Sequence, residues 1–430
     1  MTKTAWVVSI NMGYGHQRTA YPLKSFAETG KIVCANDYHG IPERDRKIWN
    51  SSRNFYEFIS RFKKFPLLGE WFFNLFDATQ KIKDFYSEEN SSDPNFTQQR
   101  TCALFDKDWG KDLIEKLSKK KIPLVSTFYN PAFMAEHFNY PGDIFCVVCD
   151  ADISRNWAPP CGKDSKVKYF VPNDRVSQRL KLYGVKKQNI IFTGYPLPME
   201  NIGGKNMEIL KEDMRNRMAN LDFNNKYREN KGFIIREKLG KLPMKSDHPL
   251  TIMFAVGGAG AQKEIGIELT RRLKKVIYGG RLKIILAAGI KKEVKEYFEK
   301  ELRNGGLGGL INEGIEIIFG NTFEDYYKKF NKALRKTDIL WTKPSELSFY
   351  SALGLPIIIA PTIGSQEEFN KSWLLKSGYG IEQREIEHVK EWLYDWLDAG
   401  YFAEMSMEGF IEVEKTGTLK IKEQIQKCSG

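Results

Sequence analysis

Residues 340–348 read LWTKPSELS, residues 352–356 read ALGLP, and residues 361–368 read PTIGSQEE. This pattern predicts a strand, a polar turn, a short helix, a buried strand and a polar loop. The two polar segments would then follow the carboxyl ends of two neighbouring parallel strands. Open α/β sheets bind ligands at that edge, so the stretch predicts a site for a nucleotide or a sugar.

Two further segments have the same form of a strand feeding a glycine-rich turn. Residues 6–11 precede GYGH at 13–16, and residues 250–256 precede GGAG at 257–260. Such a turn lets the backbone approach a ligand, and the helix that follows presents its N–H groups to an anion. After the first turn we expect a helix that runs to about Glu28.

Strand and helix patterns alternate in both halves of the chain, which predicts an α/β fold. We expect two doubly wound Rossmann-like domains that face each other across a cleft. The predicted boundaries are a first domain at 1–200, a helical connection at 201–248, a second domain at 249–384, and C-terminal helices and a tail at 385–430 that pack back on the first domain.

The composition limits the class of protein. The chain has 430 residues and a formal net charge of +12, which favours anionic partners. The sequence has no run of about 18 apolar residues, so we expect no transmembrane helix. The six cysteines do not form a disulfide framework, and Cys146 and Cys149 lie in a predicted buried strand. We interpret them as reduced structural thiols of a cytoplasmic protein, with a zinc site as the alternative.

Residues 46–86 are rich in aromatic residues interleaved with Lys and Arg. Basic residues with large aromatics on amphipathic helices are typical of attachment to an anionic membrane surface. They also fit a groove for a long-chain acceptor, or helices that are simply buried in their own domain. No recognisable nucleic-acid module accompanies them, so we expect no nucleic-acid partner.

The ordered set of motifs resembles the GT-B glycosyltransferases of family 28. The most similar members are the monogalactosyldiacylglycerol synthases and the bacterial processive diacylglycerol glucosyltransferases. The similar segments lie in the family's order over roughly residues 5 to 380, and include the turns at 13–16 and 257–260, the loop at 150–159, YFVP at 169–172, TGYP at 193–196, TKP at 342–344, GLP at 354–356 and GSQEEFN at 364–370.

The resemblance implies a UDP-sugar donor in the second domain, an acceptor in the first, and no metal or other cofactor. By position, the implied donor-site residues are Gly257, Gly258, Gly260, Asn321, Thr322, Lys343, Glu346, Gln366, Glu367 and Asn370. The implied acceptor-site residues are Gly13, Tyr14, Gly15 and Trp157. His16 or Asp150 is the implied catalytic base, and a histidine suits that role because its pKa lies near neutrality.

The chain departs from the family after Thr342-Lys343-Pro344. The family usually continues with two glycines and later has an acid that binds the ribose hydroxyls, whereas this chain has Ser345-Glu346, and Phe349 aligns with the acid. Glu346 is the predicted ribose ligand in a helix that starts earlier; the alternatives are a changed donor specificity or a degenerate site.

These features predict an inverting, metal-independent hexosyltransferase that acts on a membrane lipid and associates peripherally with an anionic membrane surface in the cytoplasm. One alternative is a related GT-B enzyme, either a UDP-N-acetylglucosamine 2-epimerase or a transferase for a soluble acceptor. The other is a non-catalytic module that binds a nucleotide-sugar.

Overall fold

The computed structural model describes residues 4–51, 91–160, 162–258, 260–362 and 365–428. The chain divides into two compact units. Unit 1 comprises residues 1–197, 363–370 and 416–430, and unit 2 comprises residues 198–362 and 371–415. Helix α15 (Ser365–Lys376) therefore contributes its first residues to unit 1 and the rest to unit 2.

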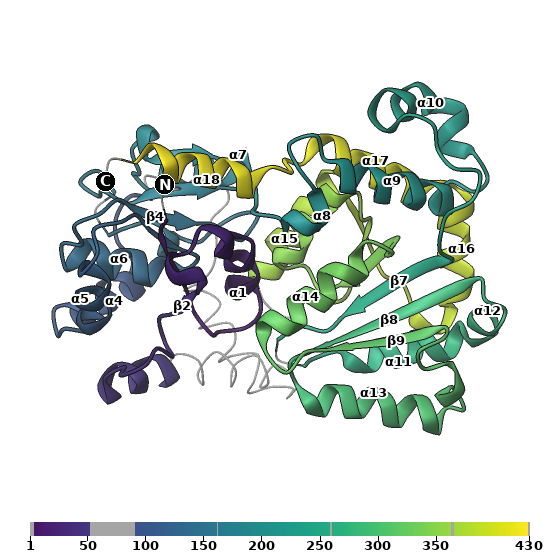
Figure 1. Cartoon of the computed structure of the whole chain (residues 1–430), viewed down its shortest axis with the longest axis horizontal. Coiled ribbons are helices and arrows are strands. Elements are labelled where there is room, and N and C mark those ends of the chain that lie inside the picture. The colour runs from purple at the N-terminus through teal and green to yellow at the C-terminus, as the bar shows by residue number, and fades with distance from the viewer. Residues whose placement is uncertain (1–3, 52–90, 161, 259, 363–364, 429–430) are drawn as a thin grey trace. The chain divides into compact units, whose positions relative to one another are not determined.

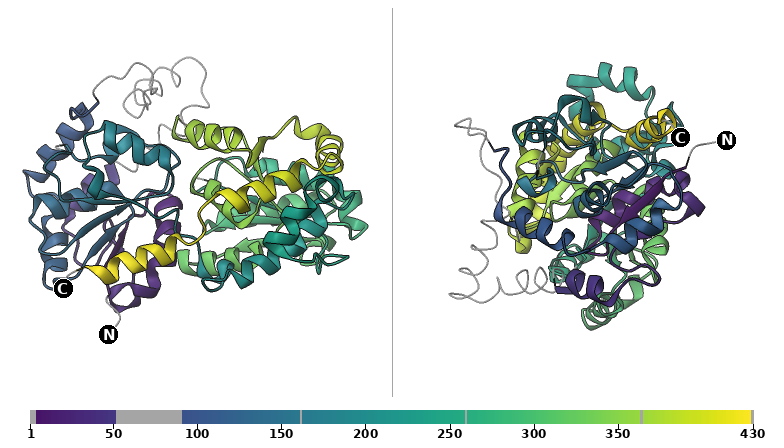
Figure 2. Two further views of the ribbon diagram at one scale, coloured as in Figure 1. Left: turned by 90° about the horizontal axis from the view of Figure 1, so that it is seen from above. Right: turned by 90° about the vertical axis from the view of Figure 1, so that its left-hand side faces the viewer.

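Unit 1 is built on a six-stranded parallel sheet with the order β2-β1-β3-β4-β5-β6 (Figures 1 and 2). Its strands are β1 (Trp6–Ser9), β2 (Val33–Cys34), β3 (Leu124–Ser126), β4 (Ile144–Val147), β5 (Lys168–Val171) and β6 (Ile190–Phe192). Its α-helices are α1 (Gly15–Ala20), α4 (Phe96–Phe105), α5 (Lys111–Ser118), α6 (Tyr129–His137), α7 (Asp174–Leu182) and α18 (Gly417–Lys427), and its 3-10 helices are η1 (Tyr21–Phe26), η2 (Glu28–Gly30), η3 (Arg155–Trp157) and η4 (Lys187–Asn189). Residues 43–51 are also helical.

Unit 2 holds a second six-stranded parallel sheet, with the order β12-β11-β10-β7-β8-β9. Its strands are β7 (Leu250–Ala255), β8 (Leu282–Gly289), β9 (Ile315–Phe319), β10 (Ile339–Thr342), β11 (Ile357–Ile359) and β12 (Gly380–Glu382). Its α-helices are α8 (Met199–Ile202), α9 (Glu208–Leu221), α10 (Lys226–Leu239), α11 (Lys263–Arg272), α12 (Lys274–Tyr278), α13 (Lys292–Asn304), α14 (Phe323–Leu334), α16 (Val389–Asp398) and α17 (Tyr401–Glu412), and its 3-10 helices are η5 (Gly308–Leu310), η6 (Glu346–Leu353) and η7 (Ile386–His388).

The predicted fold class is confirmed, because each unit has a parallel sheet with crossover helices. The central strands β4, β7 and β10 are almost wholly apolar and buried, as expected for parallel strands covered on two faces. Two Rossmann-like domains in one chain are the components of the GT-B fold that the sequence predicted.

The C-terminal helices belong to different units. Helices α16 and α17 group with unit 2, whereas α18 packs into the core of unit 1. Ile421 and Ile425 of α18 lie in one hydrophobic cluster with Val7 of β1 and Val125 of β3. Figure 2 shows α18 in yellow beside the purple N-terminal segments.

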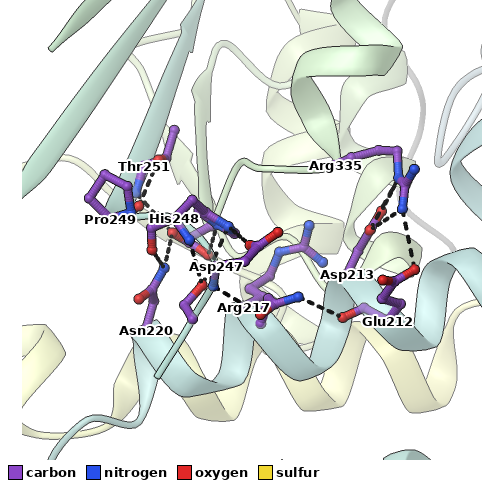
Figure 3. A network of polar contacts seen from close by, with 12 residues as sticks. Glu212, Asp213, Arg217, Asn220, Asp247, His248, Pro249, Thr251 and Arg335 are labelled. Carbon is purple, nitrogen blue, oxygen red and sulfur yellow. Dashed lines mark hydrogen bonds and ion pairs between the residues drawn. The ribbon is translucent and has the colours of Figure 1, made fainter. Parts of the chain in front are cut away.

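Helix α9, in the predicted connection at 201–248, is fixed to the sheet of unit 2 by buried polar groups (Figure 3). The buried guanidinium of Arg217 donates to the carbonyl oxygens of Thr337 at 2.9 Å and Leu353 at 2.5 Å. Asn220 donates to Asp338 at 2.9 Å, and the second oxygen of Asp338 lies 3.3 Å from His248 Nε2. Helix α9 is therefore an integral layer of unit 2.

The first helix is shorter than predicted. Helix α1 ends at Ala20 and continues as the 3-10 helix η1, with Pro22 in its first turn. Proline has no N–H to donate to the preceding turn, so the α-helical hydrogen bonds stop before it. The expectation of one helix to Glu28 was wrong.

The aromatic-basic segment predicted at 46–86 lies outside the described residues from residue 52 onward. Trp49, at its beginning, is buried, and its ring centroid lies 4.9 Å from that of Trp109. Within the described part of the chain, no helix has the length and apolar character that a bilayer crossing requires.

Candidate functional site

The strand order of unit 2 places its glycine-rich turn at a topological switch point. From β7 the chain proceeds to β8 and β9 on one side, and then returns to β10 on the other side of β7. The two connections that leave β7 and β10 diverge at the carboxyl end of the sheet, where they leave a crevice. Residues 257–260 follow β7, and residues 343–346 follow β10. The glycine-rich turn of the predicted donor site therefore lies at the carboxyl edge of the unit 2 sheet, beside this crevice.

Gly257 and Lys343 are in direct contact at this edge. A Cβ atom on Gly257 would lie 2.6 Å from Lys343 Cε, so the lysine side chain passes across bare backbone. Gly260 closes the turn by donating its N–H to the carbonyl of Gly257 at 2.8 Å, and its φ of +73° favours glycine. The contact places a cation beside a glycine-rich turn that leads into α11, an arrangement suited to a diphosphate.

The side chain of Gln262 connects the turn to the segment that follows β11. The sequence did not predict Gln262 as a residue of the site. Its Nε2 donates to the carbonyl oxygen of Pro361 at 2.7 Å, just beyond β11. Gln262 has a φ of +63° and lies at the start of α11. Its place two residues after Gly260 was the signal that could have identified it, because side chains at that position border the same edge of the sheet.

Glu346 occupies the position that distinguishes this chain from the family pattern. Glu346 is the first residue of η6, a 3-10 helix of eight residues, which is long for a 3-10 helix. The Glu346 side chain is buried. Phe349, which aligns with the ribose-binding acid of the family, is also buried, with its ring centroid 5.1 Å from that of Trp373. Phe349 therefore serves the core, and Glu346 remains the predicted ribose ligand.

Asn321 and Thr322, predicted to lie near the base, form the start of α14. Thr322 Oγ1 accepts from the N–H of Asp325 at 3.1 Å, which is an N-cap, and the N–H of Asn321 donates to the Asp325 carboxylate at 3.1 Å. They follow β9, two strands from β7 in the sheet. Their contact with a base stays a prediction.

Unit 1 brings His16 to its own switch point. From β1 the chain passes to β2 on one side, and later returns to β3 on the other side of β1. His16 follows β1 and lies in the first turn of α1. Its Nδ1 lies 2.9 Å from the carbonyl oxygen of Thr127, directly after β3, and 3.5 Å from Cys149 Sγ, directly after β4. A carbonyl oxygen only accepts, so Nδ1 carries the hydrogen and the basic nitrogen of neutral His16 is Nε2.

Aromatic rings surround this histidine. The centroid of the Phe128 ring lies 4.8 Å from that of His16 in an edge-on arrangement, and the Trp157 ring lies 6.2 Å away. Trp157 is buried against Tyr129. Trp157, predicted as an acceptor contact, therefore lies close to the predicted base and forms part of the wall beside it.

The turn before His16 combines an open glycine with a buried tyrosine. Gly13 has a φ of +95°, and a Cβ there would meet no atom within 4 Å, so backbone conformation rather than crowding favours glycine. Tyr14 is buried. Gly15 begins α1. Acceptor binding by these three residues stays a prediction.

The loop after β4 gives its two aspartates different surroundings. Asp152 is buried and receives two hydrogen bonds from Arg179 and one from Arg175, each at 2.9 Å. Asp150 instead accepts from Asn370 Nδ2 at 3.2 Å, while Asn370 Oδ1 accepts from the N–H of Ala151 at 2.9 Å. Asp152 is thus held as a structural ion pair, whereas Asp150 accepts a hydrogen bond from the neutral amide of Asn370.

Helix α15 carries the remaining predicted donor residues. Asn370 is fully engaged with the loop at 150–151, so the structure assigns it a contact within unit 1. Glu367 is partly exposed, and the side chain of Gln366 lies outside the described residues. Among the residues that the structure describes, no three His, Cys, Asp or Glu side chains gather into a potential metal site.

Residues 241–317 match a family model described as a domain of unknown function (DUF6938). No curated protein matches the chain in sequence. Similar solved structures include S. aureus MnaA with UDP (12% identity, 80% of each chain, TM-score 0.44). Others are Acinetobacter baumannii MurG (13%, 73% of this chain and 78% of that one, 0.44) and Neisseria meningitidis UDP-GlcNAc 2-epimerase bound to UDP-GlcNAc (12%, 77% and 82%, 0.45). At these identities and scores the likeness carries no conclusion about substrate or chemistry.

Proposed function

We propose that the protein is a glycosyltransferase that binds a UDP-sugar in unit 2 and transfers the sugar to an acceptor hydroxyl. One observation carries the proposal: the Lys343 side chain lies across Gly257 at the switch point between β7 and β10. A diphosphate needs a cation and unobstructed backbone N–H groups together. The order of the motifs in the sequence supports UDP-sugar as the form in which that diphosphate arrives.

The chemistry follows from the residues at the two switch points. Nε2 of His16 removes the proton of the acceptor hydroxyl while its oxygen bonds to the anomeric carbon. The bond from that carbon to the diphosphate breaks, and the electron pair leaves with UDP. The N–H groups of Gly257 and Gly258 and the ammonium of Lys343 stabilise the charge that develops on the diphosphate. Attack from the face opposite the leaving group inverts the anomeric carbon, and no step uses a metal.

A UDP-sugar epimerase is the second candidate, because the arrangement at Gly257 and Lys343 would serve any enzyme that holds a nucleoside diphosphate. The surroundings of His16 favour the transferase. A histidine fixed with Nε2 as its basic nitrogen, with aromatic rings beside it, suits deprotonation of a bound hydroxyl. Net release of UDP separates the two, since an epimerase releases none at completion.

Calorimetric titration with UDP tests the donor site. We expect the unsubstituted chain to bind, and Lys343→Ala to lower the affinity about tenfold or more, because it removes a charge-assisted contact to the diphosphate. Lys332→Ala, on the side of α14, is the matched control. Absence of UDP binding by the unsubstituted chain would overturn the enzymatic proposal and favour a scaffold without donor chemistry.

Incubation with UDP-sugars and diacylglycerol-containing vesicles tests transfer. We expect release of UDP, and about a 100-fold loss of rate in His16→Ala, because general-base catalysis contributes at least that much. His39→Ala is the control, since His39 is an exposed histidine of the same unit. Equal rates in His16→Ala and the unsubstituted chain would remove His16 from the mechanism and leave Asp150 as the base.

We propose a membrane lipid as the acceptor, on the basis of the aromatic-basic composition of residues 46–86. Because Trp49 is buried, the test leaves residues 46–51 unchanged and replaces Arg61, Lys63, Lys64, Lys81 and Lys83 by Gln. We expect weaker, less salt-sensitive binding to anionic vesicles. Unchanged flotation with such vesicles would exclude the segment as a membrane contact.

A further inference from the structure

Large apolar side chains are exposed around α10 and the segments that flank it. Within the described residues, Phe223 is 50% exposed, Phe233 61% and Met244 104%, and Tyr401 of α17 is 49% exposed. A single exposed apolar side chain is ordinary, but several of them on neighbouring segments are typical of an interaction surface. We call these four residues and the basic residues among them the α10 surface.

Helix α10 presents Phe233 from a fixed position. The helix is kinked at Lys231; Tyr227 before the kink and Ile235 and Leu239 after it are buried, whereas Phe233 is exposed. Arg215 of α9 donates to the carbonyl oxygen of Leu239 at 3.3 Å. In Figure 1, α10 lies beyond α9, away from the strands of unit 2. Phe233 is therefore held outward by a helix that is packed on its other face.

Met244 occupies the middle of the loop that follows α10, and both ends of this loop contact α9. The loop begins at Leu239, next to Arg215, and ends at Asp247, whose N–H donates to Asn216 Oδ1 at 3.2 Å. Because Arg215 and Asn216 are consecutive, the two ends of the loop meet at one place on α9. The intervening residues project outward, and this explains the full exposure of Met244.

Phe223 and Tyr401 lie at the other end of α10. Asn224, next to Phe223, donates to Asp398 at the end of α16 at 3.1 Å. A Cβ on Gly400, next to Tyr401, would lie 3.2 Å from the Cβ of Lys226. These contacts bring Phe223 and Tyr401 beside the first turn of α10, so the exposed apolar side chains flank one helix at its two ends and its middle.

The α10 surface is strongly basic. Residues 223–245 contain seven Lys or Arg and two acidic residues. Arg228, Lys231 and Lys238 have carboxylate partners. The other basic residues are exposed and form no ion pair with a described residue: Lys226, Arg236, Lys241 and Lys245. Their charge is directed to solvent, and a partner with negative charge would complement it.

We propose that the α10 surface docks on an anionic lipid bilayer. Phe233 and Met244 would enter the boundary between headgroups and acyl chains, while Arg236, Lys241 and Lys245 contact lipid phosphates. Nucleic acid would satisfy the basic residues and stack with the rings, but offers no apolar phase to Met244. A bilayer supplies phosphates and an apolar phase together, which is why it is the partner that fits. The inference rests on the proposed function and deepens it by naming a protein surface that docks on the bilayer in which a lipid acceptor would be found.

Flotation of the full chain with vesicles of equal parts phosphatidylglycerol and phosphatidylcholine tests the proposal. We expect Phe233→Ser with Met244→Ser to lower vesicle binding about tenfold, and Lys241→Glu with Lys245→Glu to lower it at least as much. The matched controls are Phe192→Ser, an exposed aromatic of unit 1, and Lys274→Glu with Lys275→Glu on α12. Unchanged binding in the α10 variants, or equal binding of the unsubstituted chain to pure phosphatidylcholine, would overturn it.

A second measurement reports on Met244 directly. An environment-sensitive dye on Met244→Cys should shift its emission to shorter wavelength with anionic vesicles, relative to the unsubstituted chain labelled in the same way. A shift with an acidic polypeptide or a nucleic acid in place of vesicles, and none with vesicles, would assign the surface to another partner and overturn the proposal. Neither measurement needs a nucleotide, and UDP titration needs no vesicles, so the docking surface and the donor site can fail separately.

Discussion

The side chain of Asn370 is hydrogen-bonded to Asp150, 220 positions away in the sequence, over 3.2 Å. The same amide accepts from the N–H of Ala151 at 2.9 Å. Asn370 is buried, so its amide is taken up by the loop that carries one of the two candidate bases. In this structure Asn370 holds Asp150, and a role in binding the donor sugar would require it to release that loop.

Asn370→Ala should lower the free energy of unfolding of unit 1 by about 1–3 kcal/mol, because it removes the hydrogen bonds that this amide makes with the buried N–H of Ala151 and with the Asp150 carboxylate. Chemical denaturation measures the change. Gln99→Ala is the control, since Gln99 is exposed and its amide makes only a long hydrogen bond to Pro94. A stability equal to that of the unsubstituted chain would show that the hydrogen bonds to Asp150 and Ala151 are not maintained in solution.

Gly257→Ala should weaken UDP binding about tenfold while it changes stability little. The new methyl group would lie 2.6 Å from Lys343 Cε, and the end of a lysine side chain can move aside without disturbing the core. Titration with UDP and thermal unfolding separate the two effects. Gly309→Ala is the control, because a Cβ at residue 309 would meet no atom within 4 Å. An unaltered affinity for UDP would show that the diphosphate does not bind at the turn formed by residues 257–260.

Asp152→Asn should destabilise unit 1 by about 3 kcal/mol, because it removes the negative charge that accepts two hydrogen bonds from the buried Arg179 guanidinium. Asp106→Asn is the control, since the Asp106 carboxylate is largely exposed. Denaturant unfolding measures the difference between the two variants. Equal stabilities would show that Arg179 finds another acceptor, and that the loop at 150–159 does not depend on this ion pair.

His248 should make the stability of unit 2 depend on pH. Burial alone lowers the pKa of His248, but hydrogen bonds and charges from Asp338 and Asp247 outweigh it, and the pKa is raised. The folded state therefore binds the proton more tightly than the unfolded state. This contribution is fully present below the unfolded pKa of about 6.5, and is lost as the pH rises through the folded pKa.

Unfolding followed from pH 6 upward should therefore show a fall in stability that His248→Gln reduces. His388→Gln is the control, because His388 makes no ion pair with a described residue and lies in η7 of the same unit. The pH profiles of the two variants should differ. Identical profiles for His248→Gln and the unsubstituted chain would show that the network in Figure 3 holds neutral histidine.

Local patterns in the sequence were sufficient for the strands and the glycine-rich turns, because buried parallel strands are nearly continuous apolar runs and glycines follow where the backbone needs them. The strand Ile339–Thr342 and the turn after Ala255 are examples. The extent of the first helix was mispredicted because the effect of Pro22 on the preceding turn was not weighed.

The candidate site was predictable only in part. Its predicted location at strand ends follows from the order of strands and turns, and His16, Gly257 and Lys343 were predicted as site residues from that order together with the family resemblance. Sequence gave no sign that Thr127 orients His16, or that Asn370 holds Asp150, since each contact joins segments more than a hundred residues apart. Gln262 was missed although it lies two residues after Gly260, because its partner Pro361 is 99 positions away in the sequence.

The sequence by itself determined the α/β class, the two glycine-rich turns and the charge of the chain, because these depend on residue type and short-range spacing. The tertiary structure decided that Lys343 crosses Gly257, that Phe349 belongs to the core while Glu346 lies at the start of η6, and that Nδ1 of His16 carries the hydrogen. Those outcomes depend on which strands become neighbours. That neighbourhood is fixed only when the crossovers place β10 beside β7 and β3 beside β1.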